Sequence, residues 1–146
     1  MSISDQVLKK LRQWMLAGGE VPAAISVIRV RDDSSVLDGT ELILRADDPS
    51  EHETLRGMER IEGEAVVSIS VDDVHDVDDR QWIIGEVTGI LREGTGDPET
   101  RFEDWLADGE HGVLAYGFRV SGSTWEEDER RVVGRVAWGC WACATA

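Results

Sequence analysis

The segment Glu64–Gly94, EAVVSISVDDVHDVDDRQWIIGEVTGILREG, constrains the fold most, because its hydrophobic period changes from two to about 3.6 partway along. In its first part, apolar and polar residues alternate, with Val67, Ile69 and Val71 on the apolar side. This alternation predicts a β-strand that has one apolar face and one polar face.

The second part of the segment has the pattern of an amphipathic helix over about Asp79–Arg92. The acidic run DVHDVDD before it supplies oxygens that cap a helix, and Gly94 allows a left-handed stop. The apolar stripe of this helix consists of Ile83, Ile84, Val87, Ile90 and Leu91. The segment therefore predicts a strand that leads directly into a helix.

The length and composition are those of a single domain spanning residues 1–146. A chain of 146 residues with 41% apolar content can bury a hydrophobic core. No apolar run approaches the roughly 20 residues that a membrane-spanning helix requires. The first residues, MSISDQVLKK, also lack the apolar block of a signal peptide. We therefore expect a soluble protein that is made inside the cell and has no membrane partner.

The charge balance is strongly acidic, with 30 acidic residues against 15 basic ones, and the only lysines are Lys9 and Lys10. A net charge of −15 argues against a protein that binds nucleic acid through its phosphates, because such binding requires basic side chains. Three compatible explanations stay open. They are a host with a salty cytoplasm, imitation of DNA by an array of carboxylates, and a surface that repels DNA passing close by.

Residues 4–17 have the pattern of an N-terminal amphipathic helix, with Ser4 as the expected cap and Gly18-Gly19 as the expected end. The apolar side of this helix carries Val7, Leu8, Leu11 and Met15. Much of the opposite side is basic and consists of Lys9, Lys10 and Arg12. These three residues are either an ordinary solvated face or a contact to an acidic neighbouring subunit.

The next segments alternate like strands. Ala23–Arg31 and Thr40–Ala46 flank the turn sequence DDSSVLDG, so we expect them to pair as a hairpin. The polar stretch Asp47–Gly63 contains Pro49 and predicts either a short helix around Glu51–Met58 or a mobile loop.

The C-terminal third contains a short helical pattern at Arg101–Ala107, followed by two strand patterns, Val113–Val120 and Val132–Trp141. The connection SGSTWEEDERR between these strands predicts a closing antiparallel hairpin with a charged tip. Together the patterns predict an α+β fold. Its mostly antiparallel sheet is expected to be packed by the N-terminal helix and the central helix.

Candidate chemistry begins with Cys140 and Cys143, which are spaced as in a redox or zinc motif. There is no second pair of cysteines, and residues three apart on a strand point to opposite faces. We interpret both as small buried side chains.

The three histidines, His52, His75 and His111, stand singly, and the acidic turn around His75 lacks the spacing of a calcium loop. Nucleotide-binding and nucleophile motifs are absent from the sequence. We therefore expect no enzyme activity, no metal and no cofactor.

Six tryptophans are many for a chain with one tyrosine and two phenylalanines, and subunit interfaces favour this residue. They are Trp14, Trp82, Trp105, Trp125, Trp138 and Trp141. On a helical wheel Trp82 falls away from the apolar stripe and beside Gly85 and Gly89. Trp82 therefore either meets a neighbouring subunit or folds over the edge of its own domain.

Four stretches occur in a suggestive order: VLKKLRQWML, GTELILRAD, AVVSISVDDVHDVDDRQWIIGEVTGIL and AYGFRVSGSTWEEDERRVVGRVAWGCW. In this order of helix, strands, strand-helix unit and closing hairpin, most of the chain resembles the tail terminator, or tail-completion, proteins of long-tailed phages. The match is one of pattern and not of a diagnostic motif. The acidic, lysine-poor composition suits a head-tailed virus of a halophilic archaeon.

The resemblance implies a structural virion protein. Proteins of this family form a homohexameric ring that caps the tail tube, stops its polymerisation and joins it to the head connector. The implied partners are other copies of the chain, the tail tube protein and the head-tail connector protein, and DNA passes through without specific binding. The implied location is the tail or neck of the virion, after assembly in the host cytoplasm.

Within this interpretation we expect subunits to meet at two sets of residues, Trp82, Gly85 and Gly89, and Lys9, Lys10 and Arg12. The loops Asp47–Gly63 and Ser121–Arg131 are the expected docking surfaces for the partners. Their candidate contact residues are Glu51, His52, Trp125, Glu126, Glu127 and Asp128.

Two other classes of protein stay open at this point. An acidic inhibitor that imitates DNA predicts carboxylates arrayed on one exposed face. A flavin- or haem-related split barrel predicts that the alternating strands close into a barrel. The sequence offers no basic cluster near a strand end to hold a flavin phosphate, which argues against the barrel.

Overall fold

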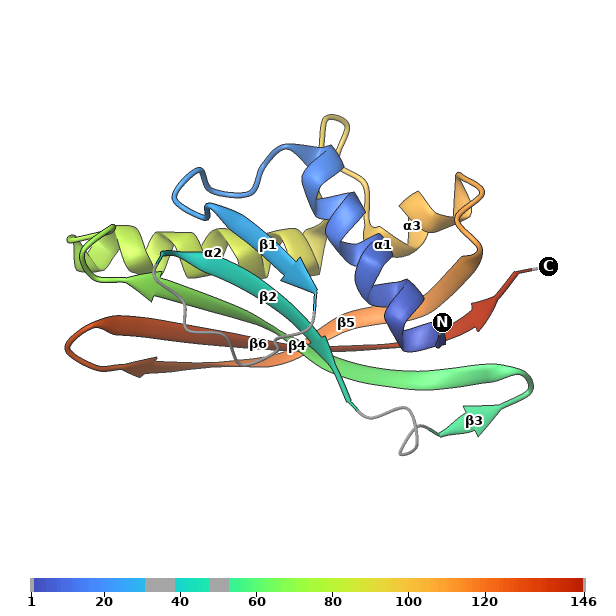
Figure 1. Ribbon diagram of the computed structural model, residues 1–146. Helices are drawn as coiled ribbons and strands as arrows, with labels where there is room; N and C mark the ends of the chain where they lie inside the picture. The colour runs from blue at the N-terminus through green and yellow to red at the C-terminus, as the bar shows by residue number, and fades with distance from the viewer. Residues whose placement is uncertain (1, 31–38, 48–52, 146) are drawn as a thin grey trace.

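In the part of the chain that the structure describes, six strands form one open sheet, and three helices pack on it (Figure 1). The computed structural model describes residues 2–30, 39–47 and 53–145. Along the sheet the strand order is β1-β2-β4-β6-β5, with β3 paired to β4. The elements are α1 (Ile3–Gly18), β1 (Val27–Val30), β2 (Glu41–Ala46), β3 (Thr54–Leu55), β4 (Met58–Ser70), α2 (Val77–Glu93), α3 (Phe102–Ala107), β5 (Val113–Glu127) and β6 (Arg131–Ala144). This α+β architecture confirms the predicted fold class.

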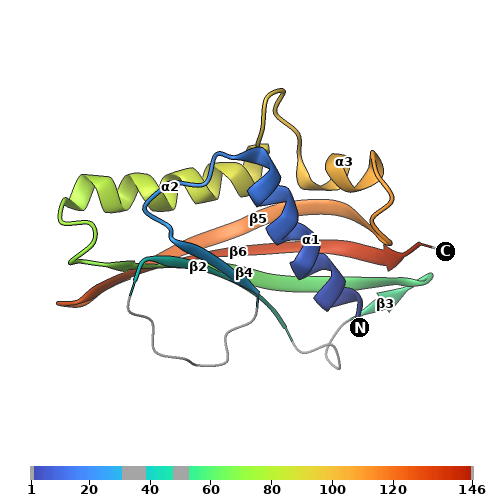
Figure 2. The ribbon, with the colours of Figure 1, turned by 45° about the horizontal axis from the view of Figure 1, so that its top comes forward.

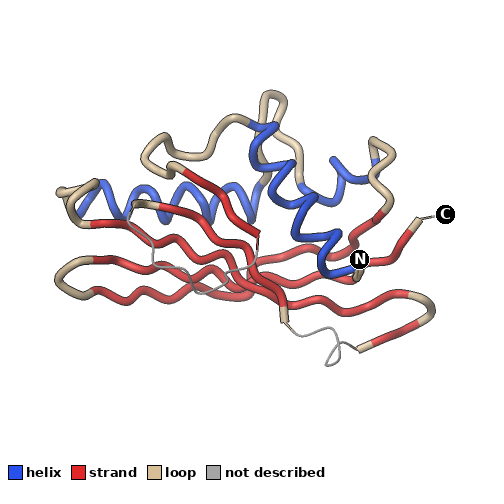
Figure 3. The backbone as a smooth tube through the Cα atoms, in the orientation of Figure 1, coloured by secondary structure: helices blue, strands red, loops and turns tan. Residues whose placement is uncertain are grey.

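The helices α1, α2 and α3 all lie on the same face of the sheet, as Figures 2 and 3 show. The core lies between this face and the helices, because alternate strand residues point toward them. The sheet contributes Leu42, Leu44, Ile61, Ala65, Val67, Ile69, Val132, Val136 and Cys140 to this core. The predicted apolar residues of α1 and α2 are all buried there.

The predicted strand-helix unit is present as β4 and α2. The helix begins at Val77, two residues before the predicted Asp79, because the Asp76 side chain accepts a hydrogen bond from the Asp78 N–H at 2.8 Å. It ends at Glu93, and the cap residue Gly94 has a positive φ of 112° but a ψ of −179°, so it does not adopt the predicted left-handed conformation. The predicted polar strand face is present, but it is not solvent-exposed throughout, because Ser68 and Ser70 are buried.

The helix α1 begins at Ile3, one residue earlier than predicted, and its cap lies two residues earlier than the predicted one. Ser2 is its cap and accepts a hydrogen bond from the Asp5 N–H at 3.1 Å, whereas the predicted cap Ser4 is buried inside the helix. The predicted end is confirmed, since Gly19 adopts the left-handed conformation with a φ of 69°. Gly18 can lie against the Thr95 side chain because it carries no Cβ.

The predicted hairpin of the first two strands was wrong. β1 and β2 are neighbours, but they pair in parallel, with Val27 opposite Glu41 and Val30 opposite Leu44. The prediction failed because neighbouring strands were assumed to reverse direction at the turn sequence. Ten residues can span about 33 Å, well beyond the length of a four-residue strand, so the connection is long enough to return the chain for parallel pairing.

A helix around Glu51–Met58 was one of two predictions, and it is wrong for the described part of that range. β3 and β4 form a tight hairpin there, with positive φ at Arg56 (53°) and Gly57 (80°). The predicted contact residues Glu51 and His52 lie outside the described residues.

The closing antiparallel hairpin is confirmed, with Val113 opposite Ala144 and Glu127 opposite Val132. Its tip is far shorter than predicted, because most of SGSTWEEDERR continues the strands. The Asp128 side chain accepts hydrogen bonds from the N–H groups of Arg130 and Arg131 at 2.7 and 2.8 Å. These bonds fix the turn and lower the pKa of Asp128.

Candidate subunit interface

The inner face of α2 packs on β5 and β6. Ile83, Val87 and Leu91 are at most 2% exposed, and Ile84 lies directly over Gly134 of β6. A Cβ at Gly134 would lie only 2.7 Å from the Ile84 Cδ1 atom, so the helix can approach this closely only because position 134 is glycine. This face is therefore fully used within the domain.

The outer face of α2 is formed by Trp82, Gly85 and Gly89. It does not pack on the sheet as the inner face does. Trp82 is 57% exposed, and a Cβ built at Gly85 or Gly89 would meet no atom within 4 Å. The structure thus places these residues as the helical wheel predicted. More than half of Trp82 is exposed, so its own domain covers only the remainder. An interface at this face stays a prediction.

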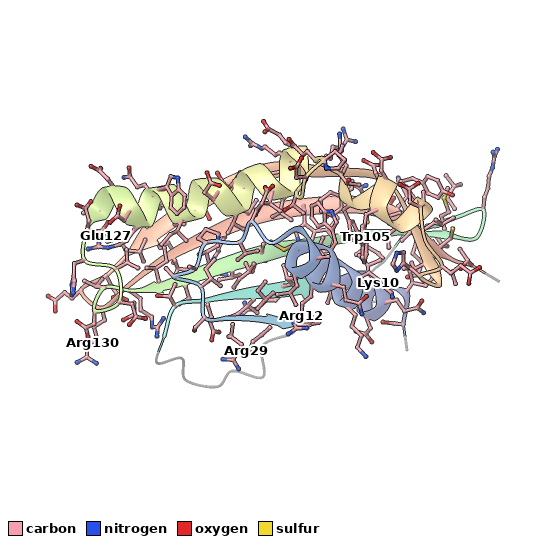
Figure 4. All side chains as sticks on the ribbon, turned by 90° about the horizontal axis from the view of Figure 1, so that it is seen from above. Lys10, Arg12, Arg29, Trp105, Glu127 and Arg130 are labelled. Carbon is pink, nitrogen blue, oxygen red and sulfur yellow. The ribbon has the colours of Figure 1, made fainter. Side chains whose placement is uncertain are left out.

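The basic residues of α1 divide into different roles. The Arg12 Nε atom donates to the Ile28 carbonyl at 2.8 Å and so ties α1 to β1. The Lys10 Nζ atom donates to the Gln13 side chain at 3.2 Å, and Lys9 is exposed. Figure 4 shows Lys10, Arg12 and Arg29 along the side of the molecule opposite α2. Arg12 therefore has a structural role that the sequence did not reveal.

The hairpin tip differs from the docking loop that we expected. Trp125, Glu126 and Glu127 are strand residues of β5, and only Asp128 belongs to the turn. All four are exposed, so they remain available for contact. The Val71 N–H donates to the Arg130 carbonyl at 2.9 Å, which joins this tip to the turn between β4 and α2.

The sheet face opposite the helices carries a network of charges that the sequence analysis missed. Arg29 pairs with Glu41 at 3.1 Å, and the Glu64 carboxylate receives Arg135 at 3.0 Å and Arg45 at 3.7 Å. The network surrounds a buried cross-strand pair, Ile43 and Val66. The alternation along each strand places these residues on one face of the sheet. Which charges become neighbours depends on how the strands are paired, which the sequence does not reveal.

A concavity of about 340 Å³ also lies on this side of the sheet. Its charged lining consists of Arg45, Asp47, Arg60, Glu62, Glu64 and Arg119. Arg60 lies 3.7 Å from Glu62, and Arg45 lies at the same distance from Glu64. Both signs of charge are balanced here, so the concavity has no strong preference for an anion.

The edge strand β5 is partly covered by side chains from α3. The Arg101 Nη2 atom donates to the Phe118 carbonyl at 2.8 Å, and the Glu103 Oε2 atom accepts from the Gly117 N–H at 3.1 Å. These bonds satisfy edge groups at the bulge between Tyr116 and Arg119. The short helix thus protects an edge that would otherwise be open to another strand.

Most of the remaining tryptophans serve the core or its rim. Trp14 and Trp138 are nearly fully buried, and the Trp14 Nε1 atom donates to the Thr100 carbonyl at 3.0 Å. Trp138 stacks on Phe118 with ring centroids 5.6 Å apart, and Trp105 stacks on His111 at 4.1 Å. Burial and nearby Lys10 lower the pKa of His111. Among the aromatic side chains of the described residues, Trp82 therefore has the largest exposed fraction.

The cysteines lie on opposite faces of β6, as the three-residue spacing predicted. Cys140 is buried, and its burial raises the pKa of its thiol to about 12, while Cys143 is half-buried and opposite Leu114. Among the described residues, no group of three histidine, cysteine or acidic side chains is placed to hold a metal ion. None of the described helices is long and apolar enough to cross a membrane.

Comparison with known proteins adds no relative. No protein-family model matches this chain, and no curated protein matches it in sequence.

Proposed function

We propose that this chain is a tail terminator of a head-tailed virus, a structural subunit that assembles into a homohexameric ring. The ring would cap the tail tube, stop its polymerisation and join it to the head connector. The observation that carries the proposal is the outer face of α2, where a large aromatic side chain is exposed beside two open glycines. Exposed aromatic area of this kind is typical of subunit interfaces.

The open sheet supports a ring because its two edges differ. A closed ring needs a heterologous interface, in which each subunit presents two different patches. One edge of this sheet is β1, near the basic residues of α1, and the other is β5, near α2. Since the described strands end in two unlike edges, they form no closed barrel of the split-barrel type.

The acidic residues support passage of DNA without binding. One end of the molecule gathers the turn between β4 and α2 and the tip of the β5–β6 hairpin (Figure 1). The exposed acids there are Asp72, Asp73, Asp76, Asp78, Asp79, Glu126, Glu127, Asp128 and Glu129. If this end faces the lumen of the ring, it repels the phosphates of passing DNA.

The same acidic end favours a second candidate, an inhibitor that imitates DNA. The two candidates differ in their partners, because an inhibitor binds a basic nucleic-acid enzyme and a terminator binds its own copies and a tube. A halophilic host fits either of them.

The test is sedimentation velocity and electron microscopy of the purified chain in molar potassium chloride, alone and with the tail tube protein. We expect six-fold rings that cap tubes of the partner. A strict monomer under both conditions contradicts the terminator. Displacement of DNA from a basic enzyme by that monomer would favour the inhibitor.

A further inference from the structure

An apolar groove lies on the β1 edge of the sheet, between the C-terminal half of α1 and the chain that enters β1. Its volume is about 300 Å³, and its apolar lining includes Met15, Leu16, Val21, Pro22, Ile25 and Val27. Leu16 and Val27 remain 50% and 41% exposed at this groove. An open apolar groove of this size is at the lower limit of sites that enclose a bulky group, about 300–1,000 Å³.

One element of the same chain carries a group that fits such a groove. Trp82 has the largest exposed fraction among the large hydrophobic side chains of the described residues, at 57%. The open positions Gly85 and Gly89 beside it let another backbone approach the helix closely. We propose that the groove receives Trp82 from a second copy of this chain.

The charges around the two surfaces are complementary. Trp82 lies one helical turn from Asp78 and from Glu86, so carboxylates flank the side chain. Arg12 lines the groove and is held there by its bond to the Ile28 carbonyl, and Lys9 lies two turns before Leu16 on the same side of α1. The acidic surroundings of the tryptophan thus face basic surroundings at the groove.

The two surfaces lie at opposite edges of the sheet. The groove borders β1, whereas α2 packs over β5 and β6 at the far edge (Figure 4). A copy that inserts its Trp82 into a neighbour therefore keeps its own groove open for the next copy. This is the heterologous geometry that a ring requires, and the inference rests on the proposed ring.

The experiment is a complementation assay by sedimentation velocity and native mass spectrometry on the full chain. Trp82→Ala removes the inserted side chain, and Leu16→Glu places a charge at the groove. Each variant alone should associate at least about thirtyfold more weakly than the wild type, as expected for an interface hot spot. An equimolar mixture should give 1:1 dimers, because one intact Trp82 then meets one intact groove.

Matched controls separate this interface from a general effect of exposed apolar residues. Leu55→Glu changes a leucine of similar exposure, 54%, on β3, and Tyr116→Ala changes another exposed aromatic side chain, at 48%. Both controls should assemble like the wild type. Circular dichroism verifies folding, and Ala23→Glu, which also lines the groove, replaces Leu16→Glu if that variant does not fold.

Three results overturn the inference, and the first two are distinguishable from the third. If Leu16→Glu and Ala23→Glu assemble normally while Trp82→Ala does not, the ring stands but the groove is not the receptor. The same conclusion follows if the mixture gives no 1:1 dimer. If the wild-type chain is a monomer with and without tube protein, the proposed function fails together with the inference.

Discussion

The two faces of α2 differ in burial: one packs on the sheet, and the other is exposed. The inner face buries Ile83, Val87 and Leu91 against the sheet. Ile84 packs on Gly134, which has no Cβ to obstruct it. The outer face exposes Trp82 and leaves Gly85 and Gly89 uncovered. One face is therefore committed to the fold, and the other is available to a partner.

This difference shows which surface of the molecule needs a partner. The sheet face away from the helices also lacks a helical cover among the described residues, but it carries Arg–Glu pairs, and Ile43 and Val66 are buried there. The outer face of α2 has no such cover among the described residues, so a partner would gain most by binding there.

A charge on the inner face should have the largest effect on stability. Val87→Asp places an unpaired carboxylate in the core, which costs about 3–5 kcal/mol and should leave the chain largely unfolded. Gly85→Asp is the matched control on the outer face, where no atom lies within 4 Å of the built Cβ. Urea unfolding followed by circular dichroism measures both. Equal losses in the two variants would contradict the assignment of faces.

The close approach of α2 to the sheet predicts the next effect. Gly134→Ala forces its Cβ against Ile84, and overpacking of this kind costs about 1–3 kcal/mol. Ile84→Val in the same chain should recover part of the loss, because it removes the Cδ1 atom nearest that Cβ. Gly122→Ala, on β5 with no atom near its built Cβ, should change the free energy of unfolding little. A Gly134→Ala variant as stable as the wild type would mean that the helix lies farther from β6.

Much of this comparison follows from the sequence, because it depends on local periodicity. The 3.6-residue period predicts the apolar stripe from Ile83 to Leu91 and the position of Trp82 outside that stripe. Tertiary contacts did not change either of them. The parallel pairing of β1 and β2 could not be read in this way, since strand direction depends on contacts distant in sequence. The same holds for Arg12, whose partner Ile28 lies on another element. The groove at the β1 edge likewise exists only once α1 and β1 are packed together.

The two cysteines of β6 also differ in burial, since Cys140 is buried and Cys143 is half-buried. Burial raises the pKa of Cys140 from 9.0 to about 12, so above pH 9 the unfolded thiol loses its proton while the folded thiol keeps it. Stability should therefore fall by about 1.4 kcal/mol per pH unit between pH 9 and about 12 through this group. The measurement is the pH slope of urea unfolding in the wild type minus that in Cys140→Ala. An unchanged slope in Cys140→Ala would show that the thiol is accessible, and Cys143→Ala serves as the control.

The cap of α2 tests the helix without favouring either face. Asp76→Ala removes the bond to the Asp78 N–H and should cost about 1 kcal/mol. Asp72→Ala, an exposed acid in the same turn, controls for the lost charge and should have little effect. Thermal unfolding compares the two variants. A similar loss in both would assign the effect to charge and not to the cap.

The smallest effect on the monomer is expected at Trp82, although it is the largest exposed side chain of the helix. Trp82→Ala truncates a side chain that is 57% exposed, so the free energy of unfolding of the monomer should change by less than about 0.5 kcal/mol. Trp14→Ala, at a position only 2% exposed, should cost about 3–5 kcal/mol and provides the contrast. Chemical unfolding at concentrations below assembly measures both. A loss at Trp82 close to that at Trp14 would mean that this tryptophan serves its own domain, and the outer face would then lose its claim as an interface.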